Sequence, residues 1–211
     1  MKTIIIILFL YCVGFSAQNL ESKNPKHSLI ETGVFMSFSN LKVKDHIGFY
    51  GGYWYRYTAD ETDTHLELGT NFGYSKSLYD FNYGKNGELF PIRSKEFIWS
   101  FGARMVKEFD LKNNKIEWIT ELSMKNLFFD EGDIPQDEPR KTMDQDDQTI
   151  YIDTHTASLS SLKIGQGVRF WKNNIGFGVQ ASYIPYRLWY RETIPKGVNS
   201  FSFEMSFNIK F

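Results

Sequence analysis

The sequence lacks the features that define several large classes of protein. After Phe15 no apolar run approaches the ~20 residues that a membrane-spanning helix needs. The single cysteine, Cys12, lies in the N-terminal apolar run, so the rest of the chain offers no disulfide, thiol nucleophile or thiolate ligand. An excess of one charge is also missing: 24 Lys and Arg face 25 Asp and Glu. A net charge of −1 gives no reason to expect a nucleic-acid partner.

Aromatic residues, by contrast, are abundant. They make up 17% of a chain that is only 42% hydrophobic and has a mean hydropathy of −0.38. A chain that is rich in rings but polar on average is typical of a protein built from strands, with one apolar and one polar face.

The first residues predict a secretory signal peptide. Lys2 precedes an apolar run from Ile4 to Phe15, and the small residues Ser16 and Ala17 follow it. We expect cleavage after Ala17, which divides the chain into a signal peptide over 1–17 and a single domain over 18–211.

The remaining chain is patterned in steps of two. Apolar and polar residues alternate because successive side chains of a strand point to opposite faces of the sheet. The last segment is the clearest, with Phe201, Phe203, Phe207 and Phe211 on one face. The pattern predicts eight strands and no convincing helix, over the segments 29–39, 47–57, 66–74, 97–105, 116–125, 162–170, 175–183 and 201–211.

The lengths of the connections predict the topology. After a first connection at 40–45, short connections at 58–64, 110–115 and 172–174 alternate with long loops near 76–95, 128–160 and 186–198. Tight turns that alternate with long loops are typical of outer-membrane barrels, in which the tight turns face the periplasm. We therefore expect an all-β fold, an eight-stranded antiparallel up-and-down transmembrane β-barrel (ten strands possible), with both termini in the periplasm.

Composition favours a barrel whose polar face points inward. Gly, Ser and Asn with sparse charges dominate that face and suit the crowded lumen of eight strands. The opposite face, rich in Phe, Leu, Val and Ile and flanked by Tyr and Trp, suits lipid and its interfaces. The alternative is a soluble, secreted, lipocalin-like binding barrel with its apolar face turned inward.

Three features together resemble a known family. The leader ends in Ser16-Ala17-Gln18, Gly-rich aromatic strands such as Ile175–Tyr183 recur, and the last strand closes on Phe211. This pattern resembles the small outer-membrane β-barrel proteins of Bacteroidota, the PorT-like and OmpA/OmpX-like group. The resemblance implies a bacterial outer-membrane location in contact with lipid. It also implies that the barrel-assembly machinery reads Phe201, Phe203, Phe207 and Phe211 as an assembly signal.

Charged residues on the predicted inner face are candidates for a site. We expect a structural network of ion pairs that fills the lumen, because a buried charge needs a partner. A narrow channel or porin-like pore is the alternative interpretation. The inward positions are Glu67, Arg104, Glu117, Glu121, Lys125, Lys163, Arg169 and Glu204.

The predicted outer loops suggest weaker candidates. The acidic segment 130–148 lacks the spacing of a calcium-binding loop, so we expect it to be solvated. His46 and His155 lie toward the outer rim and would be the bases of an outer-membrane lipid hydrolase, but no nucleophile is placed beside either. A cluster of rings and guanidinium groups is a candidate for contacts with lipid headgroups: Arg187, Trp189, Tyr190 and Arg191.

These observations predict a non-enzymatic, integral outer-membrane barrel with a structural or surface-interaction role. No catalytic residue, cofactor or metal is expected. The expected partners are outer-membrane lipid, the assembly machinery during insertion, and envelope proteins.

Overall fold

The structure, a computed structural model, describes residues 27–39, 41–58, 63–85, 88–111, 114–128, 149–151, 158–186 and 200–211. These residues are almost entirely strand: β1 (Ser28–Ser39), β2 (Lys42–Lys44), β3 (Gly48–Thr58), β4 (Thr64–Lys85), β5 (Glu88–Leu111), β6 (Asn114–Phe128), β7 (Thr149–Tyr151), β8 (Ser158–Lys172), β9 (Ile175–Ile184) and β10 (Ser200–Lys210). In this part of the chain there is no helix with the length and apolar character needed to cross a bilayer.

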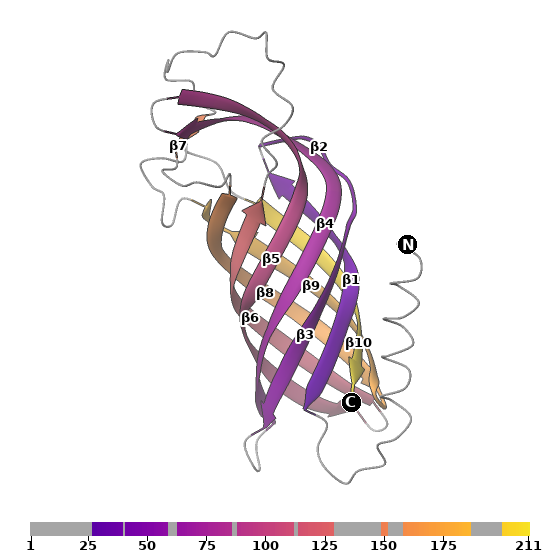
Figure 1. Cartoon of the computed structure of the whole chain (residues 1–211). Helices are drawn as coiled ribbons and strands as arrows, with labels where there is room; N and C mark the ends of the chain where they lie inside the picture. The colour runs from indigo at the N-terminus through magenta and orange to yellow at the C-terminus, as the bar shows by residue number, and fades with distance from the viewer. Residues whose placement is uncertain are drawn as a thin grey trace.

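Eight of these strands close into a barrel (Figure 1). Each strand pairs with the next in the order β4-β3-β1-β10-β9-β8-β6-β5, and β5 pairs back with β4. Every pairing in this ring is antiparallel. The predicted eight-stranded, antiparallel, up-and-down barrel is therefore confirmed. The short strands β2 and β7 pair with β4 outside the ring, which brings the sheet to ten strands.

One end of the barrel, here called the proximal end, holds the start of β1 and the end of β10. The Lys210 amide there donates to the Asn174 carbonyl at 2.9 Å, so the β8–β9 turn lies at the same end. Asn173 in this turn has a φ of 56°. Asparagine tolerates this left-handed conformation, which the favoured two-residue hairpin turns require. The opposite end is called the distal end.

The apolar residues of the alternating pattern face outward. Phe49, Phe203 and Met205 are 68%, 60% and 51% exposed. Exposed aromatic rings lie on β3, β4, β5, β6, β8, β9 and β10. Charged, hydroxyl and amide side chains make up most of the interior, together with apolar ones such as Trp54 and Trp171. This arrangement overturns the lipocalin-like alternative, which requires an apolar interior for its ligand.

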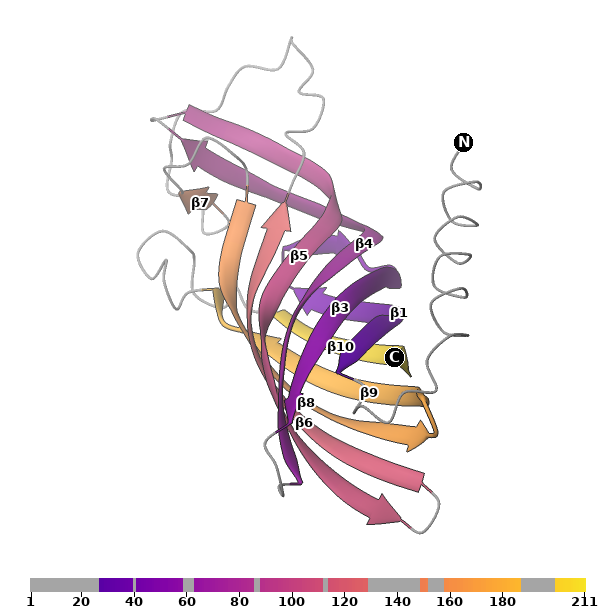
Figure 2. The same cartoon turned by 60° about the horizontal axis from the view of Figure 1, so that its bottom comes forward.

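The predicted loop at 76–95 is wrong. β4 continues to Lys85 and β5 begins at Glu88, so the segment is a hairpin that extends beyond the barrel wall and bends to one side (Figures 1 and 2). The pairing shifts between Ser75 and Leu78. A bulge of this kind changes which face the following residues occupy, and it therefore breaks the alternation that identifies a strand in sequence.

Several other predictions fall outside the described residues. They include the signal peptide over 1–17, most of the loop at 128–160 with the acidic segment 130–148 and His155, and the loop at 186–198 after Tyr186. The candidate headgroup contacts Arg187, Trp189, Tyr190 and Arg191 lie in that last range.

The interior is packed so closely that some positions have no room for a side chain. A Cβ added at Gly69 on the inner face of β4 would lie 2.3 Å from the Tyr53 carbonyl oxygen and 2.5 Å from a ring carbon of buried Trp54. A Cβ added at Gly51 would meet only the Glu31 carbonyl, at 3.8 Å.

We therefore expect Gly69→Ala to lower the free energy of unfolding by about 1–3 kcal/mol, the usual effect of overpacking. Gly51→Ala is the matched control and should leave stability unchanged or raise it by less than about 1 kcal/mol. Urea titration of the refolded barrel measures both. Equal effects of the two substitutions would contradict the close packing around Trp54.

Candidate functional site in the barrel lumen

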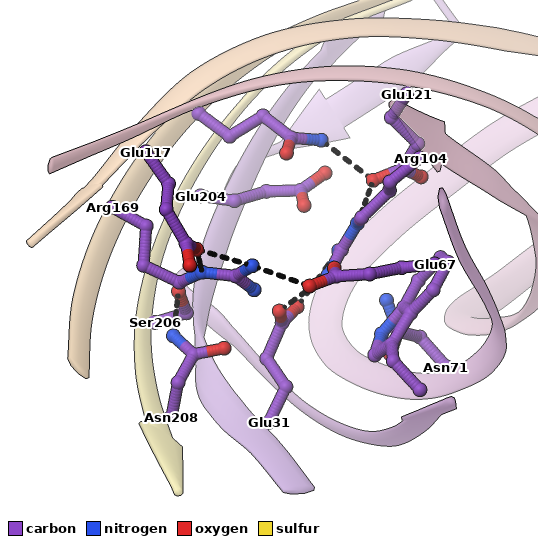
Figure 3. Close-up of polar contacts among 12 residues, drawn as sticks. Glu31, Glu67, Asn71, Arg104, Glu117, Glu121, Arg169, Glu204, Ser206 and Asn208 are labelled. Atoms are coloured by element: carbon purple, nitrogen blue, oxygen red, sulfur yellow. Dashed lines mark hydrogen bonds and ion pairs between the residues drawn. The ribbon is translucent and has the colours of Figure 1, made fainter. Parts of the chain in front are cut away.

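The candidate site is the charged interior, which consists of three groups of side chains along the barrel axis. The proximal cluster lies near the start of β1 and the end of β10, the central cluster surrounds Arg104, and the distal cluster surrounds Glu96. Strand alternation positions them, because every second residue of each strand points inward. Figure 3 shows side chains from several strands converging on this space.

The proximal cluster has two carboxylates shared among three cations. Arg56 donates through Nε to Glu67 Oε1 at 3.0 Å and through Nη1 to Glu117 Oε1 at 2.8 Å. Arg169 likewise contacts both carboxylates, at 2.6 and 2.7 Å. Lys210 Nζ donates to Glu117 Oε1 at 2.9 Å. These residues come from β3, β4, β6, β8 and β10, so the cluster ties together strands on different sides of the lumen.

The central cluster is built around Arg104 of β5. Its Nη1 and Nη2 donate to the two oxygens of Glu31 at 2.6 and 3.0 Å, and its Nε donates to Glu121 Oε2 at 2.9 Å. The guanidinium carbon lies 3.6 Å from the centre of a Trp54 ring. Such a planar cation with a two-pronged carboxylate contact and a stacked ring is held in one orientation.

Lys163 extends the central cluster toward β10. Its Nζ lies 3.2 Å from Glu121 Oε1 and 2.6 Å from Glu204 Oε1. Ser123 and Gln180 also donate to Glu121, at 2.8 and 2.9 Å, so that each of its oxygens has two partners. Donors of this number compensate a buried carboxylate for the loss of water.

The distal cluster is centred on Glu96, which pairs with Ser75 at the base of the hairpin extension. Its carboxylate accepts from Ser37 Oγ at 2.8 Å, from Tyr79 OH at 3.2 Å and from Lys42 Nζ at 3.0 Å. Lys42 also donates to the Ser37 carbonyl at 2.7 Å. Just beyond β9, burial raises the pKa of the Tyr186 phenol and the Glu96 carboxylate raises it further, so this phenol stays neutral.

The structure gives an inward, buried position to all eight residues that the sequence singled out. Seven of them, Glu67, Arg104, Glu117, Glu121, Lys163, Arg169 and Glu204, join in the ion pairs described above. The eighth, Lys125, is buried between the central and distal clusters. Its ammonium group has neither a hydrogen bond nor an ion pair with the described residues.

Sequence reasoning missed five charged members of the network: Glu31, Lys42, Arg56, Glu96 and Lys210. Glu31, Arg56 and Lys210 occupy the polar face of strands that the alternation does identify, so that face carries the signal that would have found them. Lys42 lies in the predicted connection 40–45, and Glu96 lies between the predicted loop at 76–95 and the predicted strand at 97–105. There, no alternation indicates an inward direction.

The described residues contain no group of three side chains arranged to hold a metal ion. Their histidines are engaged singly. His27 Nδ1 lies 2.9 Å from the Arg56 carbonyl, and His65 Nε2 lies 3.7 Å from Glu108 at the proximal end. The His46 backbone contacts Ser75 and Ser77.

We expect Glu117→Gln to lower the free energy of unfolding by about 3–5 kcal/mol, because it leaves buried cations without their counter-charge. The control is Lys115→Gln, which removes a cation that is 51% exposed and paired with Glu108, and its effect should be at most about 1 kcal/mol. Urea titrations of both variants in detergent make the comparison. A loss for Glu117→Gln as small as that for Lys115→Gln would show that the proximal cluster contributes little to stability.

Comparisons with known proteins find likeness in architecture alone. No protein-family model matches the chain, and no curated protein matches it in sequence. Neisserial surface protein A is 13% identical with a TM-score of 0.48, over 88% of this chain and 96% of that one. The attachment invasion locus protein Ail of Yersinia pestis is 14% identical with a TM-score of 0.48, over 89% and 100%. The outer membrane enzyme PagL is 11% identical with a TM-score of 0.47, over 86% and 99%. At these values no activity or ligand carries over to this chain.

Proposed function

We propose that the chain is an integral protein of a bacterial outer membrane, a non-enzymatic barrel with a structural or surface-interaction role. The observation that carries the proposal is the combination of a closed sheet, an outer face of exposed rings and aliphatic side chains, and an interior of paired charges.

The apolar outer face of the barrel supports the proposal that this face contacts lipid. Large apolar side chains are exposed on β3, β4, β5, β6, β8, β9 and β10. Water-soluble monomers rarely expose contiguous apolar patches beyond a few hundred Å². The strands β1, β9 and β10 have 12, 10 and 11 residues, which matches the ~9–11 residues that a tilted strand needs to cross a bilayer.

Ring closure supports the same conclusion. A sheet edge in hydrocarbon would leave backbone groups without partners, at several kcal/mol each. Here the β4–β5 pairing removes both edges of the wall. Tyr53, Tyr55 and Tyr57 gather toward the proximal end of β3, while Tyr74 and Tyr183 lie toward the distal end of the barrel wall. Such rings suit the two interfaces of a membrane.

The lumen supports a structural role over conduction. Arg56, Arg104 and Arg169 each bridge two carboxylates across the interior. An eight-stranded barrel has an interior just wide enough for its side chains, and here they fill it with mutual contacts. The narrow-channel alternative would need several of these buried pairs to separate at once.

The histidines support a non-enzymatic role. A rim hydrolase needs a base within hydrogen-bond reach of a nucleophile. Among the described residues, His46 contacts Ser75 and Ser77 through its backbone and not through its ring.

Purified protein should therefore release no fatty acid from envelope lipid, and His46→Ala should leave that baseline unchanged. If the parent protein releases fatty acid and His46→Ala or His155→Ala does not, this part of the proposal is wrong.

The proximal end is proposed to face the periplasm. The two-residue turn at Asn173, the start of β1 and the end of β10 lie there, and short turns at the periplasmic side are general in outer-membrane barrels. Phe201, Phe203 and Phe207 on the outer face of β10, with Phe211 beyond it, are proposed as the signal read by the assembly machinery. The resemblance to small Bacteroidota barrels supports this assignment and remains a prediction, as do contacts of the outer loops with lipid or envelope proteins.

Fractionation tests the location. Full-length protein expressed in a Gram-negative host should sediment with the outer membrane and migrate differently on a gel when boiled and unboiled. Protease added to intact cells should cleave within 128–160 if the distal end faces outward. A detergent-free, soluble protein without a heat shift would refute the membrane assignment, whereas cleavage only in lysed cells would refute the orientation alone.

A charge on the outer face provides a sharper test. We expect Met205→Arg, near the middle of β10, to reduce the free energy of folding into lipid by about 2–4 kcal/mol. Asp110→Arg is the control, because Asp110 lies in the proximal β5–β6 hairpin with its side chain 80% exposed. Its effect should stay below about 1 kcal/mol. If Met205→Arg leaves stability unchanged and increases solubility, the outer face meets water and not lipid.

A further inference from the structure

The lumen contains a pocket between the central and distal clusters. Its volume is about 30 Å³, counted as the space open to the centre of a water molecule. Phe35, Tyr50 and Ile98 form an apolar side, and the facing polar side includes Lys125, Lys163 and Glu204. A space of this size holds one or two water molecules, or one ion of similar radius.

Lys125 is the unusual member of the pocket. It is 4% exposed and lines the space, yet no described residue lies within hydrogen-bond or ion-pair distance of its ammonium group. The carboxylates that act on it from further away are Glu96 and Glu204. Each of them already contacts another lysine: Lys42 Nζ lies 3.0 Å from Glu96, and Lys163 Nζ lies 2.6 Å from Glu204.

The printed ion pairs identify what is missing. Among the described side chains that are largely shielded from solvent, six cations each lie within 4.0 Å of at least one carboxylate: Lys42, Arg56, Arg104, Lys163, Arg169 and Lys210. Lys125 is the cation left over, and a buried charge without a partner is costly.

The pocket is also rich in donors. Lys125 has three N–H groups, and the Ser100 hydroxyl lines the same space. Asn71 accepts the Trp54 indole N–H at its carbonyl oxygen, at 3.1 Å, and keeps its NH₂ group as a donor. Donors, the unpaired ammonium group of Lys125 and a small volume together favour an anion over a cation.

From this geometry we propose that the lumen pocket binds a small monovalent anion of halide size, with Lys125 as its principal ligand. The anion takes the place of the missing carboxylate and completes the ionic network. The proposal depends on the lumen alone and not on the membrane location, so either can fail without the other.

Bromide provides the probe, because its anomalous X-ray scattering distinguishes it from water. Crystals of the full, folded barrel grown or soaked in bromide should show an anomalous peak beside the Lys125 ammonium. Lys125→Met should lose the peak, and Lys115→Met, which changes an exposed lysine, should keep it. A pocket with water alone in the parent protein, or a peak that persists in Lys125→Met, would overturn the proposal.

A solution measurement covers the case in which Lys125→Met does not crystallise. At matched ionic strength, the folding equilibrium constant of the parent protein should rise with bromide relative to gluconate, as 1 + [bromide]/Kd. The rise should be absent in Lys125→Met and unchanged in Lys115→Met, with urea unfolding as the readout. Equal stability of the parent protein in the two salts would contradict binding.

Discussion

The structure depends on one constraint: eight antiparallel strands that close on themselves enclose an interior with almost no free space. Most inward charged side chains are therefore paired with other inward side chains, and Lys125 beside the lumen pocket is the exception among the described residues. The bidentate contact of Arg104 with Glu31, on the opposite part of the wall, is the clearest case. Trp54 beneath that guanidinium takes up the remaining volume, and Gly69 leaves it room.

The same constraint determines the character of the outer face. With the polar residues used inside, alternation leaves the rings and aliphatic side chains outside, as Phe49 and Phe203 illustrate. A soluble barrel of this size has the reverse arrangement. The proposed membrane location and the proposed structural role therefore rest on one inside-out pattern and not on the weak likeness to solved barrels.

Sequence reasoning predicts this fold well where the period of two is unbroken. The wall strands, their antiparallel order and the inward direction of Glu121 or Arg169 all follow from alternation and the lengths of the connections. It fails where a bulge shifts the phase, as between Ser75 and Leu78, and the long hairpin beyond the bulge is lost as a result. Partners across the lumen, such as Arg169 with Glu67, depend on register and barrel closure, which a single sequence does not encode in readable form.

The contact between Arg104 and Glu31 has a consequence for how the barrel forms. These residues lie 73 positions apart, and Lys210 lies 93 positions from Glu117. Neither pair can meet until β1, β10 and β5 occupy one ring, so an open sheet carries charges without counter-charges. Contacts this distant in sequence make folding slow, and partly closed intermediates gain little from them. Closure is thus an all-or-none event: the last ion pairs across the interior form only when the last strand docks.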